Sequence, residues 1–447
     1  MEHLRNSRPV LTRRGFIRVG LGASAAVALA ACGRGGNGGG AGGELADVDV
    51  AREYDGPAVA LAFWNGFTGG DGPFLRDLVE QFNAEHDNVD VEMNTLQWAD
   101  FYSSVPPAVS RGEGPDVAVM HLDQLGTNAS RGVILPLDNV TEALDLNAGD
   151  FDQAVWDAGM YQDRRYGIPL DVHPLGFYYN KRVMEAAGLD PDSPPTDRDS
   201  LMDALDAMRS NDIQGHWVSP FMFTGGLTFQ SLAYQFGGQL YNEDASEATF
   251  DAAENVEALE WYLSLIEEGH SPSDVGQDAE HVAFTNDNNA FIWNGIWMIQ
   301  GYGEDDNLDW GVAEVPQIGS ERAVWASSHN FVLMNKQNQD ENKVRAAAAF
   351  VNWISEHSLQ WAEAGQIPAR ASVRESSEFE ALEHQPTFAN QLEYARFAPP
   401  VPGVGDAQGE LETAVGEAVL GQKSAEQALA DGVARANEVL ESAQREA

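Results

Sequence analysis

The sequence predicts an α/β fold of two lobes, in which a parallel sheet carries helices on both faces. Short apolar runs alternate with stretches of helical periodicity between residues 58 and 120, which is typical of a parallel sheet with helices on both faces. Similar helical patterns resume after residue 180. Between them lies an extended apolar and aromatic segment, residues 166–181, which suits a strand that crosses from one lobe to the other.

The first half of the chain is expected to run strand, helix, strand, helix, strand. The strands are predicted at residues 58–63, 89–93 and 115–120, and the helices at residues 75–82 and 98–111. In a sheet of this kind, ligands bind beyond the carboxyl ends of the strands. The residues that follow the first and third strands are therefore candidate ligand contacts: Trp64, Asn65, Phe67, Thr68, His121 and Asp123.

The second half of the chain continues the pattern with longer helices. A strand is expected at residues 215–223, where it carries Trp217, and residues 291–298 predict a strand that breaks into a helix opened by Trp297. Helical periodicity is found at residues 201–208, 229–236, 256–266 and 346–354, and a helical hairpin is expected near residues 420–429.

The crossing segment contains two polar side chains that local periodicity does not explain. Asp171 and His173 are two positions apart, so an extended strand places both on one face, where a polar ligand could lie against them. The same spacing fits a buried strand in which Asp171 caps a turn and His173 is hydrogen-bonded in the core. The spacing by itself leaves both interpretations open.

The first 31 residues predict an export signal. Arginines precede an apolar run at residues 19–31 that is too short to span a bilayer, and residues 12–17 contain the paired arginines of a twin-arginine signal. Cys32, the one cysteine of the chain, follows small residues as in a bacterial lipobox, so we expect it to carry a lipid. Residues 32–55 begin with a glycine-rich run and are predicted to tether the folded body to the outer face of the cytoplasmic membrane.

The chain is strongly acidic, with a formal net charge of −44 at pH 7. A field of this sign excludes nucleic acid as a partner and disfavours anionic ligands, although a local site can override the net charge. The composition therefore favours a neutral or cationic small molecule as ligand.

Several short motifs follow one another in the order found in a known family. They are Phe82-Asn83, Gly114-Pro115-Asp116-Val117, Asn180-Lys181 followed by Ala187-Gly188-Leu189, Asn294-Gly295-Ile296-Trp297, and residues 365–370. Over roughly residues 56–440 the chain resembles the sugar-binding, maltose-binding-protein-like family of extracellular solute-binding proteins of ABC importers. The resemblance implies a two-lobed periplasmic-binding-protein fold of type II, with two discontinuous doubly wound lobes joined by a hinge of several segments. It also implies no enzymatic activity.

The resemblance also implies a ligand and partners. A carbohydrate would be captured between the lobes and delivered to permease subunits with a cytoplasmic ATPase, by a monomer that needs no cofactor and no metal. The family assigns His173 to the face that meets the ligand and gives Trp297 the role of stacking on the sugar. Phe67-Thr68 and Gln124 replace charged residues of the family's maltose binder, so the identity of the sugar stays open.

Two other functions compete with carbohydrate binding. His121, Asp123, Asp171 and His173 could form a carboxylate pair or a metal site of an enzyme, but the folded body contains no zinc-helix, nucleophile-elbow or phosphate-loop motif. A binding protein for a polyamine or an iron chelate is the stronger alternative, because acidic clefts lined with tryptophan also hold cations. In that case Asp123 and Asp171 would bind the cation.

The remaining candidate contacts lie in the second half of the chain or beside predicted strand ends. We expect Trp64, Trp297 and Trp325 to line the site, and we include Gln230. Trp217 and His329 fit a ligand contact and a purely structural place equally well. Four other tryptophans are predicted to pack in the core or on helix surfaces: Trp261, Trp293, Trp353 and Trp361. The places of Trp98 and Trp156 stay undecided.

A hinge of three segments, as in binding proteins of the family that the chain resembles, sets the predicted lobe boundaries. The first lobe is expected to comprise residues 56–169 and 282–334, and the second lobe residues 170–281 and 335–447. The chain would then cross between lobes near Asp171, Val282 and Leu333.

Overall fold

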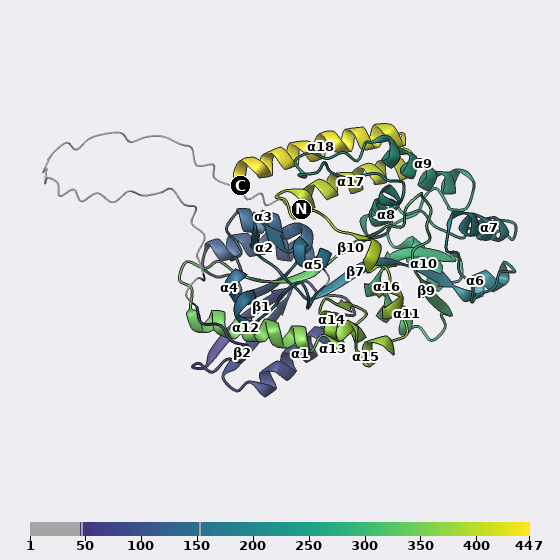
Figure 1. The fold of residues 1–447 in the computed structure, drawn as a ribbon. Coiled ribbons are helices and arrows are strands. Elements are labelled where there is room, and N and C mark those ends of the chain that lie inside the picture. The colour runs from purple at the N-terminus through teal and green to yellow at the C-terminus, as the bar shows by residue number, and fades with distance from the viewer. Residues whose placement is uncertain (1–44, 46–47, 152) are drawn as a thin grey trace, which may run out of the picture. The chain divides into compact units, whose positions relative to one another are not determined.

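The computed structural model describes Leu45, residues 48–151 and residues 153–447. The predicted export signal, Cys32 and the glycine-rich part of the tether lie outside the described residues. The described chain forms two main β-sheets with helices packed on their faces (Figure 1).

The strands are short except for β7. They are β1 (Val59–Asn65), β2 (Val89–Thr95), β3 (Val117–His121), β4 (Met160–Tyr161), β5 (Arg164–Arg165), β6 (Ile168–Pro169), β7 (Asp171–Asn180), β8 (Phe291–Gly295), β9 (Trp310–Ala313), β10 (Val324–Ser327), β11 (His329–Leu333), β12 (Ile367–Pro368) and β13 (Ala395–Arg396).

The helices of the first half are α1 (Gly72–Glu85), α2 (Trp98–Ser110), α3 (Leu122–Ser130), α4 (Asp138–Ala143), α5 (Gln153–Ala158), α6 (Lys181–Ala186), α7 (Arg198–Arg209), the π-helical η1 (Met222–Gly226) and α8 (Leu227–Gln235). Those of the second half are α9 (Ala253–Glu267), α10 (Ala279–Thr285), the 3-10 helix η2 (Ile296–Met298), α11 (Ile299–Gly303), α12 (Glu341–Glu356), α13 (Leu359–Glu363), α14 (Ala371–Arg374), α15 (Ser377–Glu380), α16 (Gln385–Ala389), the 3-10 helix η3 (Leu392–Tyr394), α17 (Val404–Val419) and α18 (Ala425–Glu446).

The first sheet has the strand order β2-β1-β3-β11-β6. β1 is parallel to β2 and β3, as the predicted strand-helix alternation requires, while β11 is antiparallel to β3 and β6. Alternate residues of β3 enter different cores, because strand side chains point to opposite faces. Val117 and Val119 pack with α1 and α12, whereas Ala118 and Met120 pack with α2 and α3, on the other side of the sheet (Figure 1).

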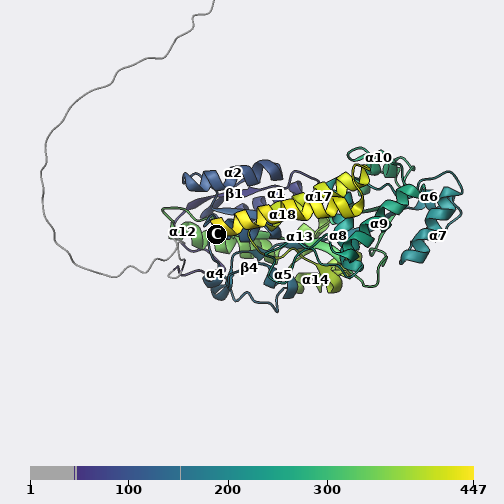
Figure 2. The ribbon, with the colours of Figure 1, turned by 90° about the horizontal axis from the view of Figure 1, so that it is seen from above.

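The second sheet is organised around β7, all ten residues of which are buried. β10 and β12 pair with the first half of β7, and β8 and β9 pair with its second half. Leu175 and Phe177 face the core formed with α8, α9, α17 and α18, whereas Tyr178 faces the core formed with α10, α11 and α16. Figure 2 shows α17 and α18 side by side in a second view.

The chain passes between the two sheets at neighbouring places. β6 leads into β7 across Leu170, and β10 leads into β11 across Ser328, so these two crossings lie side by side and are linked by a hydrogen bond from Leu170 N to His329 O of 2.8 Å. A third passage runs from α12, whose side chains enter the core of the first sheet, to β12, which pairs with β7.

The strand pairing differs from the predicted boundaries in two segments. β8, β9 and β10 belong to the second sheet although they fall within residues 282–334, and α12 packs on β1 although it falls within residues 335–447. The crossing expected near Val282 is wrong, because Val282 lies in α10, which packs on β8. The short strands of the second half carry too little periodicity to show which sheet they join.

One predicted strand is also wrong. Residues 215–223 make only an isolated bridge, between His216 and Phe291, before η1 begins. Pro220 has no backbone N–H to donate, and a Cβ at Gly225 would lie 1.9 Å from the Ser219 carbonyl oxygen, so the tight π turn depends on this glycine. The helix expected at residues 229–236 is confirmed as α8, which ends at Gln235 and is followed by Gly237 at φ +86°.

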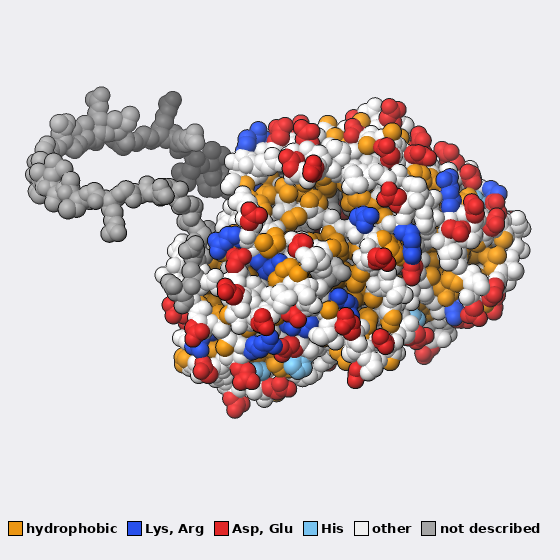
Figure 3. All heavy atoms as spheres, in the orientation of Figure 1, with side chains coloured by type: hydrophobic (Ala, Val, Ile, Leu, Met, Phe, Trp, Pro, Cys, Tyr) orange, Lys and Arg blue, Asp and Glu red, His pale blue; other side chains and the backbone are white. Residues whose placement is uncertain are grey.

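Among the charged side chains on the visible surface, acidic ones outnumber basic ones (Figure 3). None of the helices in the described part of the chain is long and apolar enough to cross a bilayer.

A buried carboxylate on the first sheet generates the first testable prediction. Asp116 Oδ1 lies 2.5 Å from Lys336 Nζ, and its Oδ2 lies 2.9 Å from Lys343 Nζ and accepts from Ala62 N. Burial raises the pKa of Asp116, but the two lysines and the Ala62 N–H outweigh burial and lower the pKa below its usual value. Asp116→Ala should therefore reduce the free energy of unfolding by about 3 kcal/mol at pH 7, measured by urea denaturation.

The effect should depend on pH in a defined direction. A carboxyl group whose pKa is lower in the folded state stabilises the fold at pH values above its unfolded-state pKa, and this stabilisation is lost as the pH falls through the folded-state pKa. The difference in unfolding free energy between the wild type and Asp116→Ala should therefore shrink below about pH 4. The control is Asp55→Ala, because Asp55 pairs with Arg345 from a side chain that is 85% exposed, and it should change stability by less than about 0.5 kcal/mol. Equal losses of unfolding free energy in Asp116→Ala and Asp55→Ala would contradict the stabilising role assigned to the buried Asp116 carboxylate.

Candidate functional site

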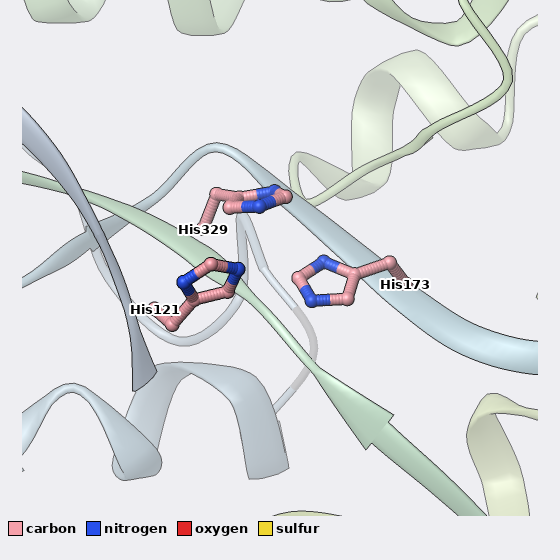
Figure 4. A group of neighbouring side chains, drawn as sticks. All are labelled: His121, His173 and His329. Carbon is pink, nitrogen blue, oxygen red and sulfur yellow. The ribbon is translucent and has the colours of Figure 1, made fainter. Parts of the chain in front are cut away.

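Three histidines from different strands meet at the crossings. His121 ends β3, His173 lies in β7 and His329 begins β11. The strand register brings them together, since His329 is directly opposite His121 in the first sheet and His173 is opposite Ser327 in the second. The ring centroids of His329 lie 4.7 Å from His121 and 4.3 Å from His173 (Figure 4). We call these three residues the histidine cluster.

Asp171 holds two members of the cluster in place. Its Oδ1 lies 3.0 Å from His173 Nδ1 and accepts from His329 N, and its Oδ2 lies 2.8 Å from both His329 Nδ1 and Trp361 Nε1. The carboxylate is fully buried, so each of these hydrogen bonds replaces one with water. Both interpretations of Asp171 and His173 are therefore partly right: the strand places them on one face, and both are buried and hydrogen-bonded.

Burial and neighbouring charges set the protonation of this centre. Burial raises the pKa of Asp171, but His329 and His173 outweigh it and hold the pKa well below its usual range, so Asp171 is ionised. Burial, together with His329, lowers the pKa of His173 to about 4 and holds the pKa of His121 well below its ordinary value. An ionised Asp171 can only accept, so His173 is neutral at pH 7 with its proton on Nδ1 and a free lone pair on Nε2.

Aromatic rings surround the cluster on the side of the first sheet. The ring of Trp98 is stacked on His329 at 5.6 Å between centroids and lies 4.3 Å from His121. Phe67 meets His329 edge-on at 4.6 Å. A Cβ at Gly66 would come within 2.0 Å of the Trp98 ring, so glycine is required there for the indole to reach the cluster.

Two predicted tryptophans reach the cluster from the side of the second sheet. Trp297, in η2, and Trp325, in β10, each lie 6.1 Å from His173 between ring centroids. Both indoles are only partly buried, although both pack against the core of the second sheet. The Trp297 ring covers Gly295, where a Cβ would come within 2.0 Å of it.

The other predicted contacts are placed differently. Asn65 is buried and shapes the loop after β1, since its Oδ1 accepts from Phe67 N. Thr68 is exposed, and Trp64 packs against the core under α2 and α3. No contact between these three side chains and the histidine cluster is found among the described residues.

Trp217 and Gln230 lie on the second sheet's side. Trp217 donates from Nε1 to the carbonyl of Gln214, and no ring contact with the cluster is found for it in the described part of the chain. Gln230 is buried in α8, and neither its Oε1 nor its Nε2 has a hydrogen-bond partner among the described residues. A buried amide of this kind is costly unless something binds to it.

Asp123 forms a second acidic centre, where α3 meets α17. Burial raises the pKa of Asp123, and burial together with Asp123 raises the pKa of Glu412 on α17 to about 8. Asp406 lies close enough to raise the pKa of Asp123 further, and the buried hydroxyl of Tyr241 has no hydrogen-bond partner among the described residues. Two facing carboxyls can share a proton and so act as donor and acceptor for an uncharged ligand.

Sequence reasoning missed several of these residues. Trp98 was undecided, and Trp361 was assigned to packing, yet its indole N–H also fixes Asp171. Tyr102, whose hydroxyl lies 2.7 Å from His121 Nδ1, and Glu412 were not singled out. Trp98 and Tyr102 are three and seven residues beyond the end of β2, a position at the edge of the sheet that could have marked them.

The facing carboxyls generate the second testable prediction. The folded state keeps a proton on Glu412 up to about pH 8, whereas the unfolded chain releases it near pH 4.5. Stability should therefore fall as the pH rises through this window, by up to about 1.4 kcal/mol per pH unit. Glu412→Gln should abolish this fall and melt at a higher temperature than the wild type at pH 8.

The groups around Glu412 define the control. Asp123 and the Tyr241 hydroxyl lie near Glu412, and Asp406 lies near Asp123. The comparison uses Glu257→Gln, which changes an exposed carboxyl on α9. That variant should follow the wild-type pH curve. If Glu412→Gln also follows it, the carboxyl is not held protonated in the fold.

Comparison with known proteins places this arrangement in a family. The sequence matches the bacterial extracellular solute-binding protein family over residues 77–387, more than half of the chain. It is 22% identical over 376 residues to a maltotriose-binding protein of Pyrococcus abyssi, covering 82% of this chain and 79% of that protein. It is also 22% identical over 345 residues to a maltooligosaccharide ABC transporter solute-binding lipoprotein of Streptococcus pneumoniae, covering 74% of this chain and 77% of that one.

The fold is shared with solved binding proteins. The crystal structure of the cyclic alpha-maltosyl-1,6-maltose binding protein of Arthrobacter globiformis superposes with a TM-score of 0.73 at 24% identity, over 87% of this chain and all of that one. This likeness confirms the predicted α/β periplasmic-binding-protein fold. Since the family match and the fold agree, the chain belongs to the bacterial extracellular solute-binding protein family, which is not enzymatic.

Proposed function

We propose that this protein is the substrate-binding lipoprotein of an ABC transporter that captures a mono- or oligosaccharide and delivers it to a membrane permease with a cytoplasmic ATPase. The observation that carries the proposal is a polar centre, Asp171 with the histidine cluster, flanked by the indoles of Trp297 and Trp325. The relatives named above for maltotriose and maltooligosaccharide support a carbohydrate ligand.

The chemistry of this centre suits a sugar. Imidazole nitrogens with free lone pairs accept hydrogen bonds from hydroxyls, and an indole face covers the apolar face of a pyranose ring. The buried amide of Gln230 offers a donor and an acceptor without partners among the described residues. Asp123 and Glu412 would hold a second part of the ligand, and the crossings beside Asp171 would serve as the hinge on which the lobes close.

The same centre argues against a polyamine or an iron chelate. Asp171 already accepts four hydrogen bonds, so its oxygens have little capacity left to accept from the ammonium groups of a polyamine. Glu412 keeps its proton up to about pH 8 and is therefore uncharged at neutral pH. Spermidine and a ferric hydroxamate belong in the ligand panel, and tight binding of either one with no response to any sugar would favour this alternative.

The ligand panel tests the proposal together with Trp297. Thermal shift across mono- and oligosaccharides should identify a stabilising sugar, whose affinity is then measured by calorimetry. Covering one sugar face removes about 100 Å² of surface from water, worth on the order of 2 kcal/mol, so Trp297→Ala should weaken binding about thirtyfold.

Trp353→Ala is the matched control, because Trp353 packs between Phe82 and His357 in the core of the first sheet. It should lower the melting temperature and leave the affinity of the folded protein unchanged. A Trp297→Ala variant with unchanged affinity and a large loss of stability would show that Trp297 is a core residue instead.

Lipidation makes a separate prediction about residues outside the described part of the chain. If Cys32 carries the anchor, mass spectrometry of protein from native membranes should find a mature chain that begins at an acylated Cys32. Cys32→Ser should move the protein to the soluble fraction, since stable anchoring needs two acyl chains or an equivalent second signal. An unmodified Cys32, or a chain that begins elsewhere, would contradict the anchor.

A further inference from the structure

The histidine cluster has the geometry of a metal-binding site. One ring nitrogen from each of His121, His173 and His329 lies within 4.8 Å of those of the other two. Figure 4 shows the three rings turned toward a common space from three separate strands. The sequence offered a metal site only as part of an enzyme, with His121, Asp123, Asp171 and His173 as candidates, whereas the fold brings His329 to His121 and His173.

The second coordination shell is already built. Asp171 Oδ1 lies 3.0 Å from His173 Nδ1, and Asp171 Oδ2 lies 2.8 Å from His329 Nδ1. The Tyr102 hydroxyl oxygen lies 2.7 Å from His121 Nδ1. Metal-bound histidines nearly always donate their other ring N–H to a carboxylate, carbonyl or similar oxygen, which fixes the tautomer and the ring orientation. With all three Nδ1 atoms engaged, the Nε2 atoms are left as the ligand atoms.

We propose that His121, His173 and His329 bind one divalent transition-metal ion of the Zn²⁺ type through their Nε2 atoms. Three imidazoles favour Zn²⁺, Co²⁺, Ni²⁺ or Cu²⁺ over Mg²⁺ and Ca²⁺, which prefer oxygen ligands. Three protein ligands leave the fourth position of a tetrahedral ion open, in the manner of zinc sites that take up an exogenous ligand. Trp297 and Trp325 lie beside His173, so a ligand held against them could reach that position.

The distances and charges are compatible with such an ion. Zn–N bonds of about 2.0–2.1 Å in a tetrahedral site place the nitrogens about 3.3 Å apart, so small rotations of the rings must draw them together. The buried carboxylate of Asp171 provides negative charge, because its two oxygens bond to the Nδ1 atoms of two of the ligands, His173 and His329. A cation therefore enters a centre that is electrostatically prepared for it.

The experiment uses the full chain, purified without a polyhistidine tag and stripped with a chelator. Calorimetric titration with ZnCl₂ should show one tight site per chain, and X-ray absorption at the zinc edge should show three imidazole nitrogens. His121→Gln, His173→Gln and His329→Gln should each weaken Zn²⁺ binding at least a hundredfold. Asp171→Asn should weaken it 10- to 100-fold, because Asp171 positions two ligands without touching the metal.

His357→Ala supplies the matched control. His357 is exposed, stacks on Trp353 away from the cluster, and its loss should leave the tight site unchanged. Circular dichroism identifies variants that fail to fold. If the histidine variants do not fold, the X-ray absorption spectrum of the zinc-loaded wild type decides by itself whether three imidazole nitrogens bind the metal. Titration curves that are identical in the wild type and the folded histidine variants, or a zinc shell without three imidazoles, would overturn the proposal.

The metal site and the carbohydrate proposal can fail separately. The metal is titrated without any sugar, and the sugar panel is run in the presence of a chelator and again with Zn²⁺. Tight zinc binding without any sugar response supports the metal site alone. Sugar binding that persists in chelator, with no tight zinc site, supports the carbohydrate function alone and overturns the metal proposal.

Discussion

The centre of this protein depends on one buried carboxylate. Asp171 is fully buried, and four hydrogen bonds from His173, His329 and Trp361 replace the water that it loses. A buried charge is tolerated only when it is paired or fully hydrogen-bonded, so these donors cannot leave without a large penalty. Because the donors come from β7, β11 and α13, the carboxylate ties together three segments that approach it from different parts of the chain.

The same arrangement explains why the candidate site residues lie at the crossings. β6 and β11 belong to the first sheet, β7 and β10 to the second, and the two passages between them are hydrogen-bonded to one another. A strand that changes sheets presents the side chains at the change to both sets of neighbours. His329 therefore contacts Trp98 and Phe67 from one sheet and His173 from the other.

The proposed affinity for a neutral sugar and the proposed affinity for a transition metal depend on the same chemical property. Each needs neutral imidazoles whose Nε2 lone pairs are free, and burial with the Asp171 hydrogen bonds provides both conditions for His173. The acidic surface contributes little to either, since it lies in water and is screened by salt. Under both proposals, the specificity depends on the few buried groups that face the centre.

Much of this architecture could be predicted from the sequence, because the local spacing of apolar residues indicates the elements that form it. The βαβαβ start, the long strand β7 with Asp171 and His173 on one face, the break after Asn294 and the terminal hairpin all follow from spacing of two or 3.6 residues. The same periodicity located the carboxyl ends of the first and third predicted strands, and this position identified Phe67 and His121 as candidate ligand contacts.

The rest was decided only by tertiary structure. Which sheet receives β8, β9 and β10, and that α12 covers β1, depends on long-range pairing that short strands do not encode locally. The contact of Trp361 with Asp171 spans 190 residues, and the raised pKa of Glu412 depends on a carboxyl on another helix. Sequence periodicity specifies which face of an element is buried, whereas the partner on that face, and with it the chemistry of the site, is fixed only when the whole chain has folded.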